Sequence, residues 1–257
     1  MHRLATTRGS VDVYCLAVPG AARLRETMPG MMSALGCVPR LSIDRGGDDT
    51  RHIGARSAQA RIASSHVRAM REYLADEAAG PFLLLLEDDC VFAEADAGAR
   101  VAEFVEALER RWPRWRTVHV GHVGLGPLVP SHVHPRLCFS AVPMTAHAVL
   151  YKGGRALAAL LRRRGGFRGR RPLFLEGNLS VSPWAKLAVW PTLATQAEPA
   201  KEYRALFRSR AHPDNFHFAL DAFTLAAAAF AWCLVAALAV ALVRHLAYIP
   251  AHAQRAA

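Results

Sequence analysis

The sequence predicts an α/β domain with a mostly parallel sheet flanked by helices, followed by one transmembrane helix. Apolar runs of strand length alternate with amphipathic segments of helix length over residues 11–120, which is typical of βαβ units. One run, FLLLL at 82–86, is continuously apolar, as strands buried on both faces of a parallel sheet are. Residues 222–243 contain no charged side chain. The 52% hydrophobic content excludes a disordered or low-complexity chain.

The first elements follow from local patterns. Residues 11–18 form a β-branched, apolar run that ends in a Pro-Gly turn, so we expect a strand there and a helix over 21–36. A second strand is expected over 37–44, and a polar loop follows it. Apolar side chains then recur every three or four residues over 57–75, which predicts an amphipathic helix.

The later elements repeat this alternation. The strand at 82–86 precedes a helix marked by apolar side chains over 101–108, and 117–120 reads as a further strand. Glycines 121, 124 and 126 come next. Because no clear helix follows them, we interpret this segment as a substrate loop rather than a dinucleotide-binding motif.

The charge-free stretch predicts a membrane span. At about 1.5 Å per residue its 22 residues extend about 33 Å, which matches a hydrocarbon core of about 30 Å. A buried core helix is the alternative, but soluble helices carry a polar face that this segment lacks. We therefore divide the chain into a domain at 11–206, a linker at 207–217, a transmembrane helix at 218–245 and a tail at 246–257. Arginines before the span outnumber those after it, so we expect a single-pass protein with a C-terminal anchor and a cytosolic domain.

The charge balance favours an anionic partner. The net charge is +11 and the isoelectric point is near 10.2, which suits a phosphorylated substrate, a lipid surface or nucleic acid. Seven arginines fall within 155–171, where a solvated helix end and a patch facing anionic lipid or a phosphorylated acceptor are the alternatives. Nucleic acid is less favoured because this block has a single aromatic side chain, Phe167, and a predicted membrane span follows the domain. The five cysteines contain no Cys-x-x-Cys pair, so neither a disulfide framework nor a thiolate zinc site is indicated.

Three carboxylates, Glu87, Asp88 and Asp89, stand where the buried strand ends. Ligands of open α/β sheets collect at the carboxyl ends of strands, and carboxylate oxygens suit Mg²⁺ or Mn²⁺, whose shells substrate phosphates often complete. If the strand geometry continues, Glu87 and Asp89 point one way and Asp88 the other. The sequence therefore predicts a diphosphate-linked substrate. The alternative is that the acids cap the next helix or lie in a solvated turn.

Several segments resemble glycosyltransferase family 25, which includes lipooligosaccharide and collagen galactosyltransferases. LLLLEDDCVF resembles the family's strand and acidic motif, and Ser65-His66 resembles its upstream Ser-His pair. AVWPTLATQ resembles its Pro-x-Leu-x-x-Gln ending, with Pro191, Leu193 and Gln196 in those places.

The opening of the domain carries the same resemblance. VDVYCLAVPGAARLRETMPGMMSALG is similar to the family's first strand and helix, with Arg23 or Arg25 in the region of its early arginine. The turn at Asp44 is similar to the family's Asp-Gly. The likeness extends over residues 11–196.

The resemblance implies a GT-A-like fold and an inverting enzyme of lipopolysaccharide biosynthesis, which the predicted span would anchor to a membrane. It would move a hexose such as galactose or glucose from a nucleotide-diphosphate sugar, expected to be a UDP-sugar, to a glycan, lipid-linked or protein hydroxyl, with Mn²⁺ or Mg²⁺. The implied roles fall on the metal ligands Asp89 and Glu87, on the donor-binding residues Glu87, Asp88, Arg23, Asp44, Ser65 and His66, and on the catalytic residues Glu176 and Asp88.

Two departures concern the acceptor side. The family's Ala-Tyr-x-x-Ser strand is replaced by a segment that begins Ala146-His147, and its Pro-x-Asp is replaced by PLFLEGN, in which Glu176 is the nearest acid. A non-catalytic membrane adaptor on a degenerate transferase fold is therefore an alternative, and a membrane-tethered nucleic-acid binder is a third.

The histidines leave two interpretations open. His66 is either a hydrogen-bonded core residue or part of the site. His119, His122, His132 and His134 surround the glycine-rich segment, but no Cys or Glu stands at ligand spacing, which disfavours a structural zinc site.

Overall fold

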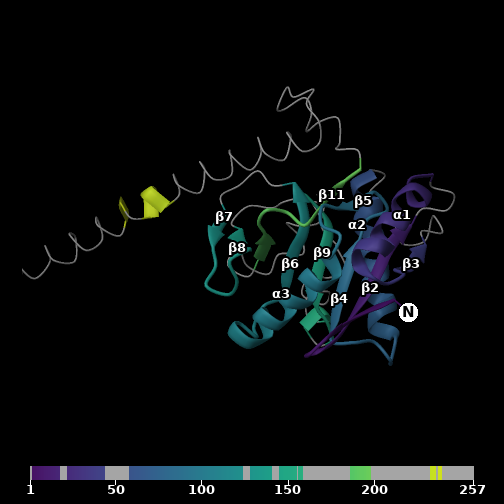
Figure 1. The fold of residues 1–257 in the computed structure, drawn as a ribbon, viewed down its shortest axis with the longest axis horizontal. Helices are drawn as coiled ribbons and strands as arrows, with labels where there is room; N and C mark the ends of the chain where they lie inside the picture. The colour runs from purple at the N-terminus through teal and green to yellow at the C-terminus, as the bar shows by residue number, and fades with distance from the viewer. Residues whose placement is uncertain are drawn as a thin grey trace, which may run out of the picture.

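The computed structural model describes residues 2–17, 22–43, 58–123, 128–140, 145–154, 156–158, 186–197, 232–235 and 237–238. Within these residues a central sheet lies between helices on both of its faces (Figure 1). The helices are α1 (Ala22–Leu35), α2 (Ala58–Ala75) and α3 (Ala97–Arg111). The strands are β1 (Arg3–Thr6), β2 (Gly9–Ala17), β3 (Arg40–Ile43), β4 (Phe82–Leu86), β5 (Cys90–Phe92), β6 (Thr117–Val123), β7 (Leu128–Pro130), β8 (Leu137–Ser140), β9 (Thr145–Lys152), β10 (Lys186–Val189) and β11 (Ala194–Gln196).

The main path of the sheet has the order β1-β2-β4-β9-β6-β10-β8-β7, and β3 pairs with β2 beyond β1. β2 is parallel to both β3 and β4, and β6 is parallel to β10. β9 runs antiparallel between β4 and β6, with Leu84 opposite Leu150 and Val118 opposite Leu150 on the other side. β11 pairs with β6 in parallel at one position, Ala194 opposite Gly121, and it pairs antiparallel with β5. β5 and β11 therefore form a two-stranded ribbon beside the end of β4.

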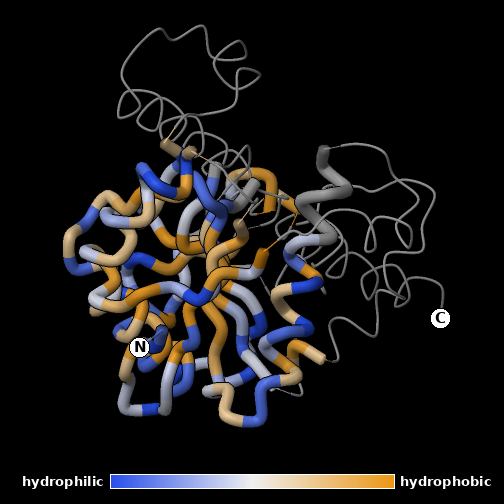
Figure 2. The backbone as a smooth tube through the Cα atoms, turned by 90° about the vertical axis from the view of Figure 1, so that its right-hand side faces the viewer, coloured by the Kyte–Doolittle hydropathy of each residue, from blue (hydrophilic) through white to orange (hydrophobic). Residues whose placement is uncertain are grey.

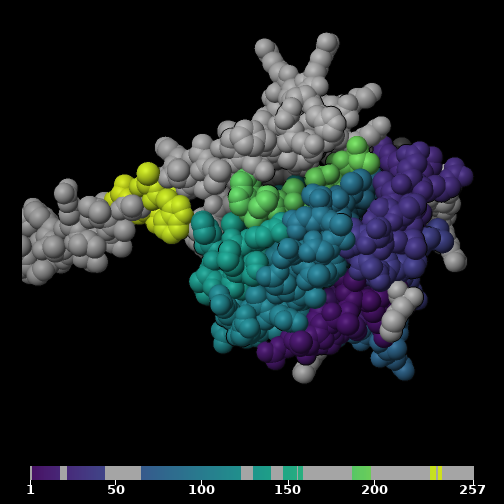
Figure 3. Space-filling model, viewed as in Figure 1, coloured from purple at the N-terminus to yellow at the C-terminus, as the bar shows by residue number. Residues whose placement is uncertain are grey.

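β4 explains why both faces of the sheet are covered. All five of its residues are buried, because Phe82, Leu84 and Leu86 pack in the cluster that includes α1 and α3, whereas Leu83 and Leu85 pack in the cluster that includes α2. The alternation follows from the two-residue period of a strand. Figure 2 shows the hydrophobic stretches gathered in the interior of the domain. In Figure 3 the purple N-terminal residues pack directly against the teal segments, and α1 is in contact with α3.

Most predicted elements are confirmed within one to four residues. The helix expected over 21–36 is α1, the helix expected over 57–75 is α2, and the strand expected over 82–86 is β4. The helix marked by apolar side chains over 101–108 is α3, which begins four residues earlier.

The prediction of a mostly parallel sheet is wrong, because the described strands form four parallel and six antiparallel pairings. A continuous apolar run shows that a strand is buried on both faces and does not show the direction of its neighbours. β1, which precedes the predicted domain boundary at residue 11, is a further element that the sequence analysis did not predict. It pairs with β2, and Arg3 Nε lies 2.6 Å from the buried Asp12 carboxylate.

The predicted membrane helix falls mostly outside the described residues. Of that segment the structure describes 232–235 and 237–238 as helical. No helix among the described residues is long and apolar enough to cross a membrane. The arginine-rich block at 155–171 also lies almost entirely outside the described residues, as do the linker and the tail.

Candidate functional site

The acidic turn extends the ladder of β4 by one residue. The Glu87 N–H donates to the carbonyl of His147 on β9 at 2.8 Å, so Glu87 is still held in the sheet. Asp88 and Asp89 then form a turn, which the Cys90 N–H closes on the Glu87 carbonyl at 3.2 Å. The three acids therefore lie at the carboxyl end of a buried strand, as predicted, but Asp88 and Asp89 do not keep the strand alternation that the sequence suggested.

α1 holds the outer side of this turn. The Thr27 hydroxyl lies 2.6 Å from the carbonyl oxygen of Asp88 and 2.9 Å from that of Arg23 in its own helix. One turn earlier, Arg23 Nη1 lies 3.5 Å from Asp89 Oδ2. Arg23, rather than Arg25, is therefore the early arginine at the acidic turn. No motif in the sequence pointed to Thr27, because its role depends on the Asp88 backbone carbonyl that the fold brings to its hydroxyl.

Asp89 is the most perturbed carboxylate among the described residues. Its exposed fraction is 6%, and burial, followed by repulsion from Glu87 and Asp88, raises its pKa to about 7, while Arg23 acts in the opposite direction. Its Oδ1 is buried and has no hydrogen-bond partner among the described residues. A buried carboxylate oxygen without a donor is costly, and a bound cation would remove that cost.

Asp88 is the more accessible acid of the turn. Burial also raises its pKa, with Glu87 as the second cause, and Arg23 opposes the shift. Its backbone carbonyl is fixed by Thr27, so the turn is anchored through the main chain rather than through the Asp88 carboxylate. The Asp88 carboxylate therefore takes no part in the hydrogen bond that Thr27 donates to the turn.

The Glu87 carboxylate contacts α2. Its Oε1 lies 3.4 Å from Nε2 of His66, which has an exposed fraction of only 1%. The structure thus brings two sequence-predicted residues together and places His66 in the core against a carboxylate of the site. His66 Nδ1 has no partner among the described residues. Ser65 is also buried, at 8% exposure.

Two other predicted site residues, Asp44 and Glu176, lie outside the described residues. Their roles therefore stay predictions from the sequence. His147 is a residue that the sequence analysis did not assign to the site. It is 1% exposed, and its carbonyl accepts the hydrogen bond from the Glu87 N–H.

The residues of the acidic turn fit a hard divalent cation in part. No group of three or more His, Cys, Asp and Glu side chains in the described part of the chain is arranged to hold a metal ion. Mg²⁺ and Mn²⁺ do not need such a cage, because one or two carboxylates with waters and substrate phosphates complete their shell. The unpartnered Oδ1 of the buried Asp89 favours a cation here.

The Pro-x-Leu-x-x-Gln segment lies against the same turn. Leu193 is fully buried, and its N–H donates to Val120 of β6 at 3.0 Å. In the β5–β11 ribbon Gln196 is the register partner of Cys90, and the Ala197 N–H donates to the Asp89 carbonyl at 2.8 Å. Residues more than 100 positions apart in the sequence are therefore neighbours at the acidic turn.

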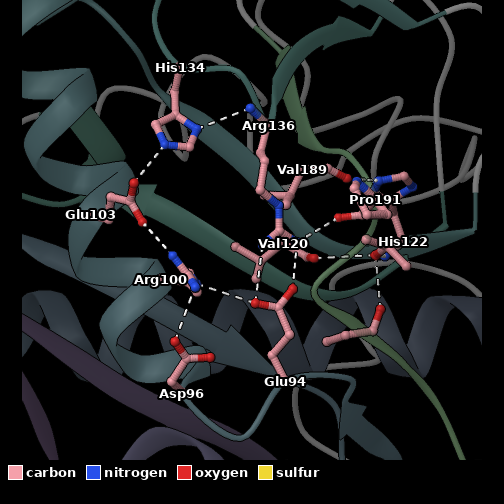
Figure 4. Close-up of polar contacts among 12 residues, drawn as sticks. Glu94, Asp96, Arg100, Glu103, Val120, His122, His134, Arg136, Val189 and Pro191 are labelled. Carbon is pink, nitrogen blue, oxygen red and sulfur yellow. Dashed lines mark hydrogen bonds and ion pairs between the residues drawn. The ribbon is translucent and has the colours of Figure 1, made fainter.

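The histidines near the glycine-rich segment have structural surroundings. His122 Nε2 lies 2.9 Å from the Val189 carbonyl, and His134 Nε2 lies 2.9 Å from Glu103 Oε1, in a network shown in Figure 4. Gly121 lies within β6, where an added Cβ would be 2.8 Å from that of Ala194. Gly121 is thus required by the approach of β11 and is not part of a loop, whereas 124–127 lie outside the described residues.

No protein-family model matches the sequence, and no curated protein matches it. Three solved structures show a distant likeness. The mannosyltransferase PcManGT from Pyrobaculum calidifontis, in complex with GDP-Man and Mn²⁺, is 16% identical at a TM-score of 0.45, covering 95% of this chain and 81% of its own. A197 from STIV is 15% identical at a TM-score of 0.37, covering 71% of this chain and 83% of its own.

The third is a glycosyltransferase involved in the glycosylation of the major capsid of PBCV-1. It is 9% identical at a TM-score of 0.42, covering 81% of this chain and 98% of its own. With TM-scores below 0.5, these likenesses do not assign this chain to a family.

Proposed function

We propose that this protein is a metal-dependent glycosyltransferase. It would transfer a hexose, galactose or glucose, from a nucleotide-diphosphate sugar, with a UDP-sugar as the expected donor, to a hydroxyl of a glycan, lipid-linked or protein acceptor. The observation that carries the proposal is the buried Asp89 at the end of β4, whose Oδ1 has no partner among the described residues. The order of segments that resemble family 25 supports the same activity.

Asp89 is the proposed ligand of Mn²⁺ or Mg²⁺, and such an ion would neutralise charge on the leaving diphosphate. Glu87 either joins Asp89 as a second ligand or contacts the nucleotide ribose, and its Oε1 lies 3.4 Å from His66 Nε2. The Arg23 side chain is 54% exposed and lies beside Asp89. Its guanidinium group is therefore proposed to bind the phosphates of the donor. Ser65 and Asp44 complete the proposed donor side.

Glu176 is the proposed general base toward the acceptor hydroxyl, with Asp88 as the second candidate, and the transfer is proposed to invert the sugar carbon. A general base must approach the acceptor oxygen to about 3 Å and need not touch the donor. Glu176→Gln should therefore lower transfer by roughly 100-fold or more while donor affinity stays within a few-fold. Near-normal transfer would indicate that Glu176 instead pairs with a nearby arginine, and Asp88 would then be tested.

The membrane remains a proposed partner. The segment at 218–245 would anchor the protein through its C-terminal end, with the catalytic domain at 11–206 on the cytosolic side. This arrangement suits an acceptor presented at a membrane surface, such as the glycolipid intermediates of lipopolysaccharide biosynthesis. The support is the 22-residue stretch without charge at 222–243.

A screen of nucleotide-diphosphate sugars for Mn²⁺-dependent hydrolysis tests the activity. We expect one donor to be hydrolysed, and we expect Asp89→Asn to abolish that hydrolysis. Asp96→Asn is the matched control, because Asp96 is a surface acid paired with Arg100 four residues later. If no donor is hydrolysed with Mn²⁺ present, the protein is better described as a non-catalytic membrane adaptor.

A further inference from the structure

The Gln196 side chain is only partly buried, but its Oε1 atom is buried and has no hydrogen-bond partner among the described residues. Gln196 is the last residue of β11 and pairs with Cys90, the residue that follows the acidic turn. Ala197 then donates its N–H to the Asp89 carbonyl at 2.8 Å, so β11 and the acidic turn are joined by the main chain. The backbone therefore fixes Gln196 beside Asp89 with little freedom to move away.

The side chains of Asp89 and Gln196 each have one oxygen that lacks a hydrogen-bond donor in the described part of the chain. Asp89 Oδ1 and Gln196 Oε1 are each buried and have no hydrogen-bond partner among the described residues. Burying a polar oxygen without a donor destabilises the fold, and a charged oxygen destabilises it more. One oxygen belongs to the acidic turn and the other to the end of β11, which the Ala197–Asp89 backbone hydrogen bond joins to that turn, so both point to a missing electropositive ligand.

We infer that the side-chain carbonyl of Gln196 is an oxygen ligand of the divalent cation that Asp89 binds. Carboxylate, carbonyl and water oxygens are the ligands that suit Mg²⁺ and Mn²⁺. The described His, Cys, Asp and Glu side chains form no metal cage by themselves, so a neutral amide oxygen supplies a contact that they do not. It also adds no negative charge beside the acidic turn, where burial, followed by repulsion from neighbouring acids, already raises the pKa values of Asp88 and Asp89.

This inference rests on the proposed metal dependence and extends it to a residue outside the acidic motif. The competing interpretation is that Gln196 is a structural amide whose packing holds the β5–β11 ribbon. The two interpretations differ in what a carboxylate at this position does. A carboxylate would still ligate the cation, whereas a structural amide would lose its fit when a charge is buried in its place.

The experiment measures Mn²⁺ binding by the full 257-residue chain in detergent, from the electron paramagnetic resonance signal of free Mn²⁺, with and without UDP. We expect Gln196→Leu to weaken Mn²⁺ binding by roughly 10-fold or more. Gln196→Glu should bind Mn²⁺ as tightly as the native chain or more tightly. Thr195→Val is the matched control, because Thr195 is the preceding residue of β11 and its side chain points to the other face of the strand. Thermal melting of each variant reports whether the ribbon stays folded.

Three results separate the possibilities. Unchanged Mn²⁺ binding in Gln196→Leu, together with loss of binding in Asp89→Asn, would overturn the inference and leave the proposed function standing. Equal weakening in Gln196→Leu and Gln196→Glu would assign Gln196 a structural role and also overturn it. If the native chain binds no Mn²⁺ even with UDP, both the inference and the proposed metal dependence fail.

Discussion

Arg23 Nη1 lies 3.5 Å from Asp89 Oδ2, and the two side chains differ sharply in their exposure to solvent. The Arg23 side chain is 54% exposed, whereas that of Asp89 is 9% exposed. The arginine therefore neutralises one carboxylate oxygen from the solvent side, and the other oxygen stays buried without a partner among the described residues. The described side chains therefore neutralise the negative charge of the acidic turn only in part.

We predict that Asp89→Asn does not lower the melting temperature of the metal-free protein. The substitution removes a charge that burial and two neighbouring carboxylates disfavour, and it leaves Arg23 free to be solvated. Differential scanning calorimetry of the native chain and the variant without metal measures the effect. A fall of several degrees in the variant would mean that Asp89 holds the fold through contacts other than those described.

Gly98 of α3 lies where an added Cβ would be 2.4 Å from the backbone carbonyl oxygen of Leu35 in α1. Because backbone cannot give way cheaply, Gly98→Ala should push the two helices apart and cost about 1–3 kcal/mol. Gly30→Ala in α1 is the control, because no atom lies within 4 Å of its added Cβ and alanine is the better helix former by about 0.5–1 kcal/mol. Chemical denaturation of both variants should give shifts of opposite sign. Similar shifts would contradict the close approach of α1 and α3.

Glu109 of α3 accepts two hydrogen bonds at Oε1, from Trp115 Nε1 at 2.6 Å and from Lys152 Nζ at 2.6 Å. Trp115 is fully buried, so Glu109→Ala leaves an indole N–H without its acceptor and should destabilise the fold by about 1–3 kcal/mol. Glu109→Gln keeps an acceptor oxygen and should recover most of that loss. Urea denaturation compares the three proteins. Equal destabilisation by alanine and glutamine would show that the charge, and not the hydrogen bond, matters.

Glu94, which lies between β5 and α3, pairs with Arg136 just before β8, and Arg136 Nη2 lies 2.7 Å from Glu94 Oε1 (Figure 4). The hydrogen bond from Arg136 is the largest cause that lowers the pKa of Glu94 below its ordinary value of 4.5. The pair therefore contributes stability above pH 4.5, and that contribution is lost as the pH falls through the lowered pKa. Melting temperatures from pH 3 to pH 7 should fall less steeply at the acid end for Glu94→Gln. Parallel curves for the two proteins would contradict this contribution.

We predict that a chain ending at residue 217 folds cooperatively. The buried hydrophobic residues that the structure describes lie between Leu4 and Ala194, while Trp232 and Leu238 are 52% and 61% exposed. Removal of 218–257 should therefore leave the core intact. Cooperative thermal unfolding of the shortened chain, followed by circular dichroism, is the measurement. Aggregation or a non-cooperative melt would show that the removed segment belongs to the core.

The sequence alone determined the elements whose patterns are local. The continuous run of Phe82–Leu86 marked β4 at its exact bounds, and the three- and four-residue spacing over 57–75 marked α2 to within one residue. It also placed the three acids at the end of a buried strand. These predictions succeed because burial on one or both faces imposes a period that neighbouring residues in the chain reveal.

The tertiary structure decided which segments meet at the acidic turn. The antiparallel insertion of β9 beside β4, the pairing of Gln196 with Cys90 and the contact of His66 with Glu87 all join residues that are distant in sequence. A hydrophobic period shows that a face is buried and does not name the element that covers it. Partner choice depends instead on how the whole chain closes its backbone hydrogen bonds and fills its core, which no local segment of the sequence specifies.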